Sequence, residues 1–373
     1  MRVPLAVAGD APLATIDESG YLHFAGGWRL EWWVGGDDHW HVPAASSSRR
    51  QRVLANTPVV ETAIRVPGGD VVWRAAAAAS ADGGAIVCEF ANTASIPVAI
   101  GIALIAPDVL DDPTSRPALH FTAPARSVAS DFGVELLVHP VSHGSTWRCS
   151  IGATAPDALP DLDAVVRGWQ ALSRQGASIA TGDESVDDAL VVARASLLLH
   201  AGRLRSRRAD KSEARAVATA LAFLSHDDEA QSLRVGAGLR PRRRGVPTVA
   251  QIDPVLTTDQ LALLENPAAA ASTVAAVRAQ LVDDAERKAV RLLPLADASA
   301  WRGRAVDVAN LATNSGSVSF ALRWHGDHPA LLWEAPPRRS RWKPGVTLRA
   351  PALDPDWSTT AASGEALLDT RRG

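Results

Sequence analysis

Residues 27–34 read Gly-Trp-Arg-Leu-Glu-Trp-Trp-Val, and this stretch decides the fold of the first part of the chain. Trp28, Leu30 and Trp32 alternate with residues of the opposite face, including Trp33. A period of two is typical of a half-buried β-strand. The same alternation recurs at 62–66 and 86–90, and Pro-Gly-Gly-Asp after the first of these supplies hairpin-turn residues. Short strands at regular spacing with no helical pattern between them predict antiparallel sheets packed as a sandwich.

The character of the sequence changes twice along the chain. Val186, Leu190 and Leu197 recur at helical spacing, and Asn266-Pro267 has the capping residue and first-turn proline of a helix that we expect to run to about Val290. Strand alternation returns at 318–324. We therefore predict an α+β fold in four parts. They are an antiparallel β-sandwich (1–155), a connection (156–183), a domain of compact α-helical hairpins (184–292) and a small C-terminal β region (293–373), whose packing on the first sandwich is left open.

Composition narrows the classes of function. The 373 residues carry a formal charge of −3 and include 2 Cys and 12 Trp. A net charge this close to zero does not attract nucleic acid or an anionic membrane to the protein as a whole. The longest apolar stretch, Ile96–Pro107, is too short to span a bilayer. We expect a cytoplasmic protein with no nucleic-acid or membrane partner. The sequence has no glycine-rich phosphate loop, and we expect no cofactor. It has no nucleophile elbow either, so nothing points to nucleophilic catalysis. We interpret Cys88 and Cys149 as free buried thiols rather than a disulfide bridge.

The tryptophans gather at the two ends of the chain, with four between Trp28 and Trp40 and four between Trp324 and Trp357. Tryptophan presents a large apolar face with one N–H donor, which suits the C–H face of a sugar ring. For Trp28 and Trp32 we favour a place in the core. For Trp33, Trp40, Trp342 and Trp357 the core and an exposed sugar-binding groove are equally favoured.

Asp37-Asp38-His39-Trp40-His41 is the densest polar cluster. On an extended segment His39 and His41 point to the same side, which suits metal ligation, but we favour a polar loop, with substrate contacts as the next alternative. We assign no metal ligand here, and we interpret the residues around His325 as a hairpin turn. The substrate-binding residues that we predict are Trp33, Asp38, His39, Trp40, Arg323, His325 and Trp357.

Three segments resemble bacterial glycosidases of the six-hairpin, (α/α) toroid type: 27–33 with 89–93, 186–201 with 214–239, and 323–334. The resemblance implies an N-terminal sandwich, toroid hairpins and a closing β segment. A complete toroid needs twelve helices, whereas 184–292 has room for about five or six. The loops corresponding to the family's catalytic loops offer no pair of carboxylates at hydrolase spacing. No catalytic residue is carried over, and the resemblance implies a shortened, non-catalytic relative.

From these observations we expect a carbohydrate-associated protein of glycosidase-like architecture. It would bind a glycan or oligosaccharide, or assist a neighbouring enzyme. Two alternatives stay open. One is an active glycoside hydrolase with a carboxylate pair that the sequence does not locate. The other is a structural module that binds a protein partner, with its tryptophans as core and interface anchors.

Overall fold

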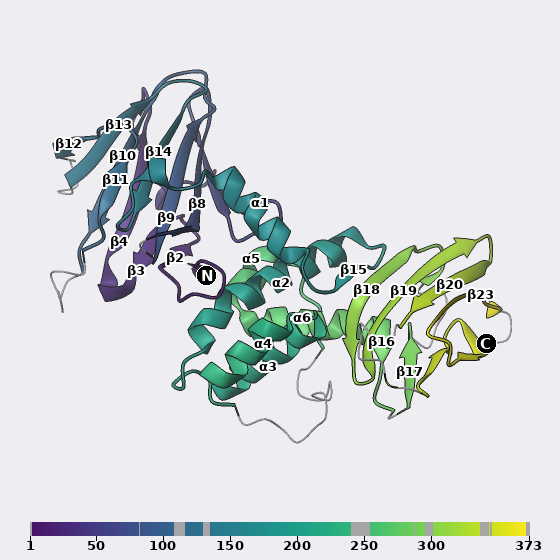
Figure 1. Ribbon diagram of the computed structural model, residues 1–373. Coiled ribbons are helices and arrows are strands. Elements are labelled where there is room, and N and C mark those ends of the chain that lie inside the picture. Colours follow the sequence, from purple (N-terminus) through teal and green to yellow (C-terminus); the bar gives the residue numbers. More distant parts are fainter. Residues whose placement is uncertain are drawn as a thin grey trace. The chain divides into compact units, whose positions relative to one another are not determined.

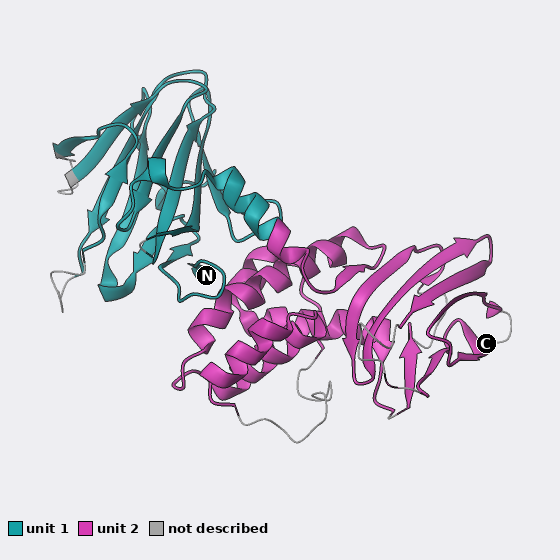
Figure 2. Ribbon diagram, in the orientation of Figure 1, with its two compact units in different colours: residues 1–170 teal, residues 171–373 magenta. Residues whose placement is uncertain are grey.

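The computed structural model describes residues 2–81, 83–107, 116–129, 135–239, 254–286, 288–294, 301–335, 343 and 345–370. The chain divides into two compact units, residues 1–170 and 171–373 (Figure 2). Unit 1 is built mainly of strands and ends within the helix Leu162–Ser173, and unit 2 combines helices with two further sheets (Figure 1).

The first sheet of unit 1, sheet A, has eight strands in the order β1-β2-β3-β4-β10-β13-β12, with β5 paired to β4. Every pair in it is antiparallel. The strands are β1 (Arg2–Leu5), β2 (Ala14–Asp17), β3 (Leu22–Phe24), β4 (Arg29–Gly35), β5 (Trp40–His41), β10 (Val98–Ile105), β12 (Arg126–Ala129) and β13 (Glu135–Val141).

The second sheet, sheet B, has six strands in the order β11-β14-β9-β8-β7-β6, again all antiparallel. They are β6 (Arg50–Val53), β7 (Val60–Val66), β8 (Gly69–Ser80), β9 (Gly83–Asn92), β11 (Leu119–Phe121) and β14 (Thr146–Ile151). The hairpin predicted at Pro67-Gly68 is confirmed, because Val66 pairs with Gly69 across it and Gly68 adopts a φ of 82°. Glycine reaches this left-handed region without a steric cost.

The two sheets meet through large aromatic rings. Trp32 of sheet A lies 5.6 Å from Trp73 and 5.9 Å from Phe90 of sheet B, between ring centroids, and all three side chains are fully buried. Aromatic pairs at this separation add stability beyond the area that they bury. The predicted sheet-rich, antiparallel first part of the chain is therefore confirmed, and Trp28 and Trp32 are core residues, as expected.

Six α-helices lie in the described part of the chain, together with short 3₁₀ helices η1 (Ala25–Gly27), η2 (Pro43–Ala45) and η4 (Pro156–Ala158). The α-helices are α1 (Leu162–Ser173), α2 (Glu184–Leu204), α3 (Lys211–Phe223), α4 (Asp227–Gly236), α5 (Gln260–Glu265) and α6 (Pro267–Leu281). Asp183, Asp210, Asp259 and Asn266 cap α2, α3, α5 and α6 with side-chain oxygens that accept two backbone N–H groups each. Helix α2 is buried along most of its length because it packs against α3, α5 and α6.

Two sheets complete unit 2. Sheet C has the order β15-β18-β19-β20-β23, and sheet D has the order β16-β17-β21-β22. Their strands are β15 (Ser178–Ala180), β18 (Val306–Thr313), β19 (Gly316–His325), β20 (His328–Glu334) and β23 (Ser363–Leu367), then β16 (Val282–Asp283), β17 (Ala289–Leu292), β21 (Thr347–Ala350) and β22 (Asp354–Thr359). Trp333 of sheet C and Trp357 of sheet D contact each other, with ring centroids 5.2 Å apart.

One prediction about the helical region is wrong, and another is not confirmed. Helix α6 ends at Leu281 rather than near Val290, because the residues that follow pair as β16 and β17, and β17 in turn pairs with β21. The array of helical hairpins is not confirmed: the described residues show a mixed fold in which antiparallel sheets predominate and helices are few. Among the described residues, no helix is long and apolar enough to cross a membrane.

Candidate functional site

An open groove crosses the exposed face of sheet C in unit 2. Its volume is about 510 Å³. Strand alternation buries Val308, Phe320 and Leu331 on one face of this sheet and leaves a row of small and polar side chains on the other. The groove is lined by Ser178, Asp307, Val308, Ala309, Ser319, Phe320, Ala321, Leu332, Trp333, Glu334, Ser363 and Gly364.

Small side chains make the floor of this groove. Ala321 lies opposite Asp307 on one neighbouring strand and opposite Leu332 on the other. Leu332 is 40% exposed, which makes it one of the few large apolar side chains on the described surface. The floor therefore offers a narrow apolar strip on which a ligand with a C–H face can rest.

Carboxylates stand at two positions along the groove. Asp307 Oδ1 accepts a hydrogen bond of 2.6 Å from Arg323 Nη2, and the other terminal nitrogen of Arg323 donates to the carbonyl oxygens of Val306 and Leu322. No hydrogen bond or ion pair joins the exposed Glu334 side chain to another described residue. One carboxylate is thus held by a guanidinium, and the other is available to accept from a ligand.

A β-bulge shapes one wall of the groove. The register of β18 against β19 shifts between Val308 and Leu311, and Asn310 adopts a φ of 57° within the shift. Asparagine tolerates this left-handed conformation better than most residues. Asn310 N–H donates to Ser319 Oγ at 3.0 Å, and Ser225 Oγ donates to the Asn310 carbonyl at 2.6 Å. The bulge therefore orients Ser319, which lines the groove.

Trp333 and Trp357 pack against each other on the buried face of sheet C. Trp333 is 8% exposed and donates from Nε1 to the Ala361 carbonyl at 3.1 Å. Gly364 on β23 packs against its ring so closely that a Cβ there would lie 2.5 Å from Trp333 Cζ2. Trp357 packs edge-on against the same ring and is half-buried, so it supports Trp333 instead of standing free as a sugar platform.

The remaining residues predicted in unit 2 lie beside the groove. Arg323 is on the same face as Ala321 and reaches the groove through Asp307. His325 pairs with His328 at the β19–β20 turn and is exposed, and it does not line the groove. The predicted turn at 325–328 is therefore confirmed. Trp342 lies outside the described residues.

The predicted residues of unit 1 gather around the hairpin between β4 and β5. Trp33 is 5% exposed and packs with Ala103 and Leu136 on the outer face of sheet A, and Trp40 covers it with its ring centroid 6.5 Å away. Trp33 Nε1 also donates to Glu31 Oε2 at 3.4 Å. Trp33 is therefore a packing residue of a second apolar cluster.

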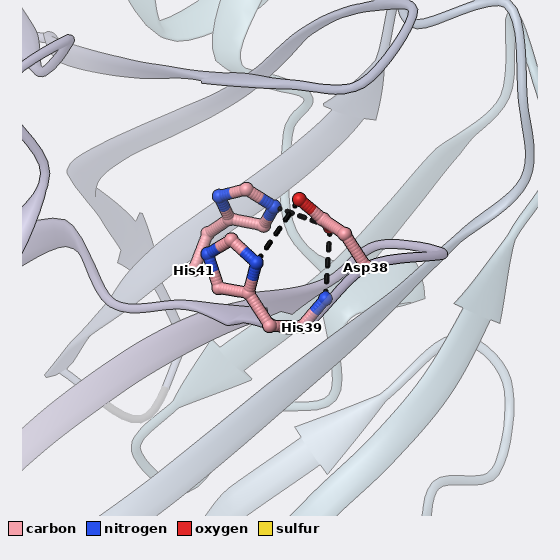
Figure 3. A group of neighbouring side chains, drawn as sticks. All are labelled: Asp38, His39 and His41. Atoms are coloured by element: carbon pink, nitrogen blue, oxygen red, sulfur yellow. Dashed lines mark hydrogen bonds and ion pairs between the residues drawn. The ribbon is translucent and has the colours of Figure 1, made fainter.

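The Asp38 carboxylate faces two neighbouring imidazoles at the tip of this hairpin (Figure 3). Its Oδ2 lies 3.0 Å from His39 Nδ1, and its Oδ1 lies 2.9 Å from His41 Nε2. The two imidazole centroids are 4.1 Å apart, which confirms that His39 and His41 point to the same side. Desolvation acts to raise the pKa of Asp38, but hydrogen bonds from His41 and from the His39 N–H outweigh it and lower that pKa.

Most residues that line the groove carry no recognisable signal in the sequence. Asp307, Ser319, Ala321 and Glu334 belong to ordinary strand patterns, and Ser178 comes from a segment predicted as a connection. The one signal available was the run of small residues alternating with buried ones along β19. No protein-family model matches the sequence, and no curated protein matches it at a significant level.

Proposed function

We propose that this protein binds a glycan or oligosaccharide in the groove on sheet C. The observation that carries the proposal is the composition of that groove: a narrow apolar strip at Ala321 and Leu332, bordered by hydroxyl and carboxylate groups at Ser319, Asp307 and Glu334. A sugar ring has the matching surface, with C–H groups on its face and hydroxyl groups around its edge.

The chemistry of the lining favours hydroxyl donors over anionic ligands. Glu334 and Asp307 repel phosphate and carboxylate groups, and the Arg323 guanidinium is already paired with Asp307. A charged acceptor makes a stronger hydrogen bond with a hydroxyl donor than a neutral one does. The small side chains of the floor let a ligand approach the strand backbone closely.

We propose that the groove binds the glycan without hydrolysing it. Glycoside cleavage needs two carboxyl groups that flank one bond at about 5 to 9.5 Å. Asp307 and Glu334 lie on two strands separated by β19, and Asp307 is tied to Arg323. The resemblance to toroid glycosidases supports a carbohydrate ligand, and it contributes no catalytic residue.

Binding of the 373-residue chain to a glycan array tests the proposal. We expect the wild-type chain to retain a defined set of oligosaccharides and Glu334→Gln to retain them at least tenfold more weakly. Glu365→Gln is the matched control, because Glu365 pairs across from Leu332, is exposed and does not line the groove. Equal loss in both variants, or no retention by the folded wild-type chain, contradicts the proposal.

A further inference from the structure

The geometry points to a second site, independent of the groove: Asp38, His39 and His41 form a binding site for a divalent transition-metal cation of the Zn²⁺ class. One carboxylate oxygen and one nitrogen from each imidazole lie within 4.8 Å of one another. In a tetrahedral zinc site with bonds of about 2.0 to 2.1 Å, the ligand atoms are roughly 3.4 Å apart. Asp38 Oδ2 lies 3.0 Å from His39 Nδ1, and Asp38 Oδ1 lies 2.9 Å from His41 Nε2, so each imidazole nitrogen is already near this distance from one of the two carboxylate oxygens.

The hairpin backbone fixes the three side chains on one side. Val34 pairs with His41 and Gly35 with Trp40, and the Gly36 N–H donates to the His39 carbonyl at 3.1 Å. Gly36 also leaves space for the cluster, because a Cβ there would lie 2.7 Å from Asp38 Oδ1 and 3.3 Å from His41 Nε2. The turn therefore brings the ligand atoms together through local contacts.

Trp40 anchors this hairpin to the sheet beneath. It lies between the two histidines in sequence and points to the opposite side, where it packs on Trp33. Two glycines make room for its ring: a Cβ at Gly101 would lie 3.1 Å from it, and one at Gly35 would lie 3.3 Å from it. A ligand pair whose intervening residue is fixed in this way loses less conformational freedom when it binds a cation.

The donor set selects the cation. Two imidazoles and one carboxylate suit Zn²⁺ and its neighbours in the first transition series, whereas Ca²⁺ and Mg²⁺ prefer all-oxygen sites. Each imidazole has a second nitrogen that can carry its proton, so His39 Nδ1 and His41 Nε2 can both present lone pairs to the cation. The His39 side chain is 64% exposed, so a fourth coordination position faces solvent. Three protein ligands with an open position form a site from which the metal can exchange.

Isothermal titration calorimetry of the untagged 373-residue chain with Zn²⁺ tests this inference, with Asp38→Asn, His39→Ala and His41→Ala as site variants. The control is His325→Ala, which removes an exposed histidine from another hairpin. We expect one Zn²⁺ per wild-type chain, at least tenfold weaker binding in each site variant, and wild-type binding in the control. We also expect millimolar Ca²⁺ or Mg²⁺ to leave the Zn²⁺ isotherm unchanged.

His39→Ala keeps the test decisive, because a side chain this exposed contributes little to the fold, and circular dichroism checks that the variant is folded. Two results would overturn the inference: the absence of stoichiometric Zn²⁺ binding by the wild-type chain, and binding that His39→Ala and His41→Ala leave intact. Because Glu334→Gln leaves this hairpin untouched, the variant should bind Zn²⁺ normally, which separates this site from the glycan-binding proposal.

Discussion

Protonation of His200 should destabilise the helical part of unit 2. His200 lies on α2, is 4% exposed and has partners at both ring nitrogens. Nε2 donates to the Leu264 carbonyl at 2.9 Å, and Nδ1 accepts from Arg203 Nη2 at 3.3 Å. The structure thus holds the neutral imidazole. Desolvation by burial is the main cause that lowers the pKa of His200 to about 4, and the charge of Arg203 adds to it.

The size of the effect follows from the two pKa values. An unfolded histidine titrates near 6.5, so the unfolded chain takes up this proton between pH 6.5 and 4 while the folded chain does not. The free energy of unfolding is therefore fully maintained above pH 6.5 and falls as the pH is lowered through this window. At about 1.4 kcal/mol per pH unit, the total loss from this residue is about 3 kcal/mol.

Urea unfolding followed by circular dichroism at 222 nm reports the loss of the helices, nearly all of which belong to unit 2. His200→Gln is the comparison, because glutamine keeps an N–H donor for Leu264 and does not titrate. We expect the free-energy difference between wild type and variant to shrink by about 3 kcal/mol between pH 7 and pH 4. A difference that stays constant across this range would refute the reasoning.

Two further predictions concern buried groups. Arg278 is 2% exposed, lies 4.3 Å over the Phe223 ring and forms an ion pair with Asp284. Asp284→Ala leaves this buried guanidinium without its carboxylate partner, so the free energy of unfolding in urea should fall by about 3 to 5 kcal/mol. Asp327→Ala, which removes the partner of exposed Arg302, should cost less than about 1 kcal/mol, and equal losses would contradict this account. Cys88 and Cys149 are free, buried and opposite each other on β9 and β14, and desolvation raises the pKa of Cys88. Both thiols should react with a thiol reagent only after unfolding, and rapid reaction of the native chain would show that this strand pair opens.

Local patterns predicted the strands of unit 1 well because their causes are local. The alternation along β4 places Trp32 inside, and Pro67-Gly68 sets the turn of its own hairpin. The burial of Trp33 depends instead on a neighbour, because the Trp40 ring packs over it. Gly101, far along the chain, leaves the space that the Trp40 ring occupies. A period of two shows which face a residue occupies and carries no information on what covers that face.

Long-range pairing explains the other differences. The alanine-rich pattern of α6 favours helix beyond Leu281, but β17 is fixed by β21, which is more than fifty residues away in the chain. The groove is assembled from five strands, and none of its small or acidic lining residues forms a motif. In contrast, the Asp38–His39–His41 cluster lies within one hairpin, so the spacing of its histidines was already visible in the sequence.

The most direct test of glycan binding in the groove is to fill its floor. Ala321→Trp places an indole over the strip between Asp307 and Leu332, and Ser317→Trp places the same side chain on the same strand face outside the groove lining. The measurement is the dissociation constant, by calorimetric titration, of an oligosaccharide that the array selects. We predict a dissociation constant at least tenfold larger for Ala321→Trp and an unchanged one for Ser317→Trp. Binding of wild-type strength by a folded Ala321→Trp chain would contradict it.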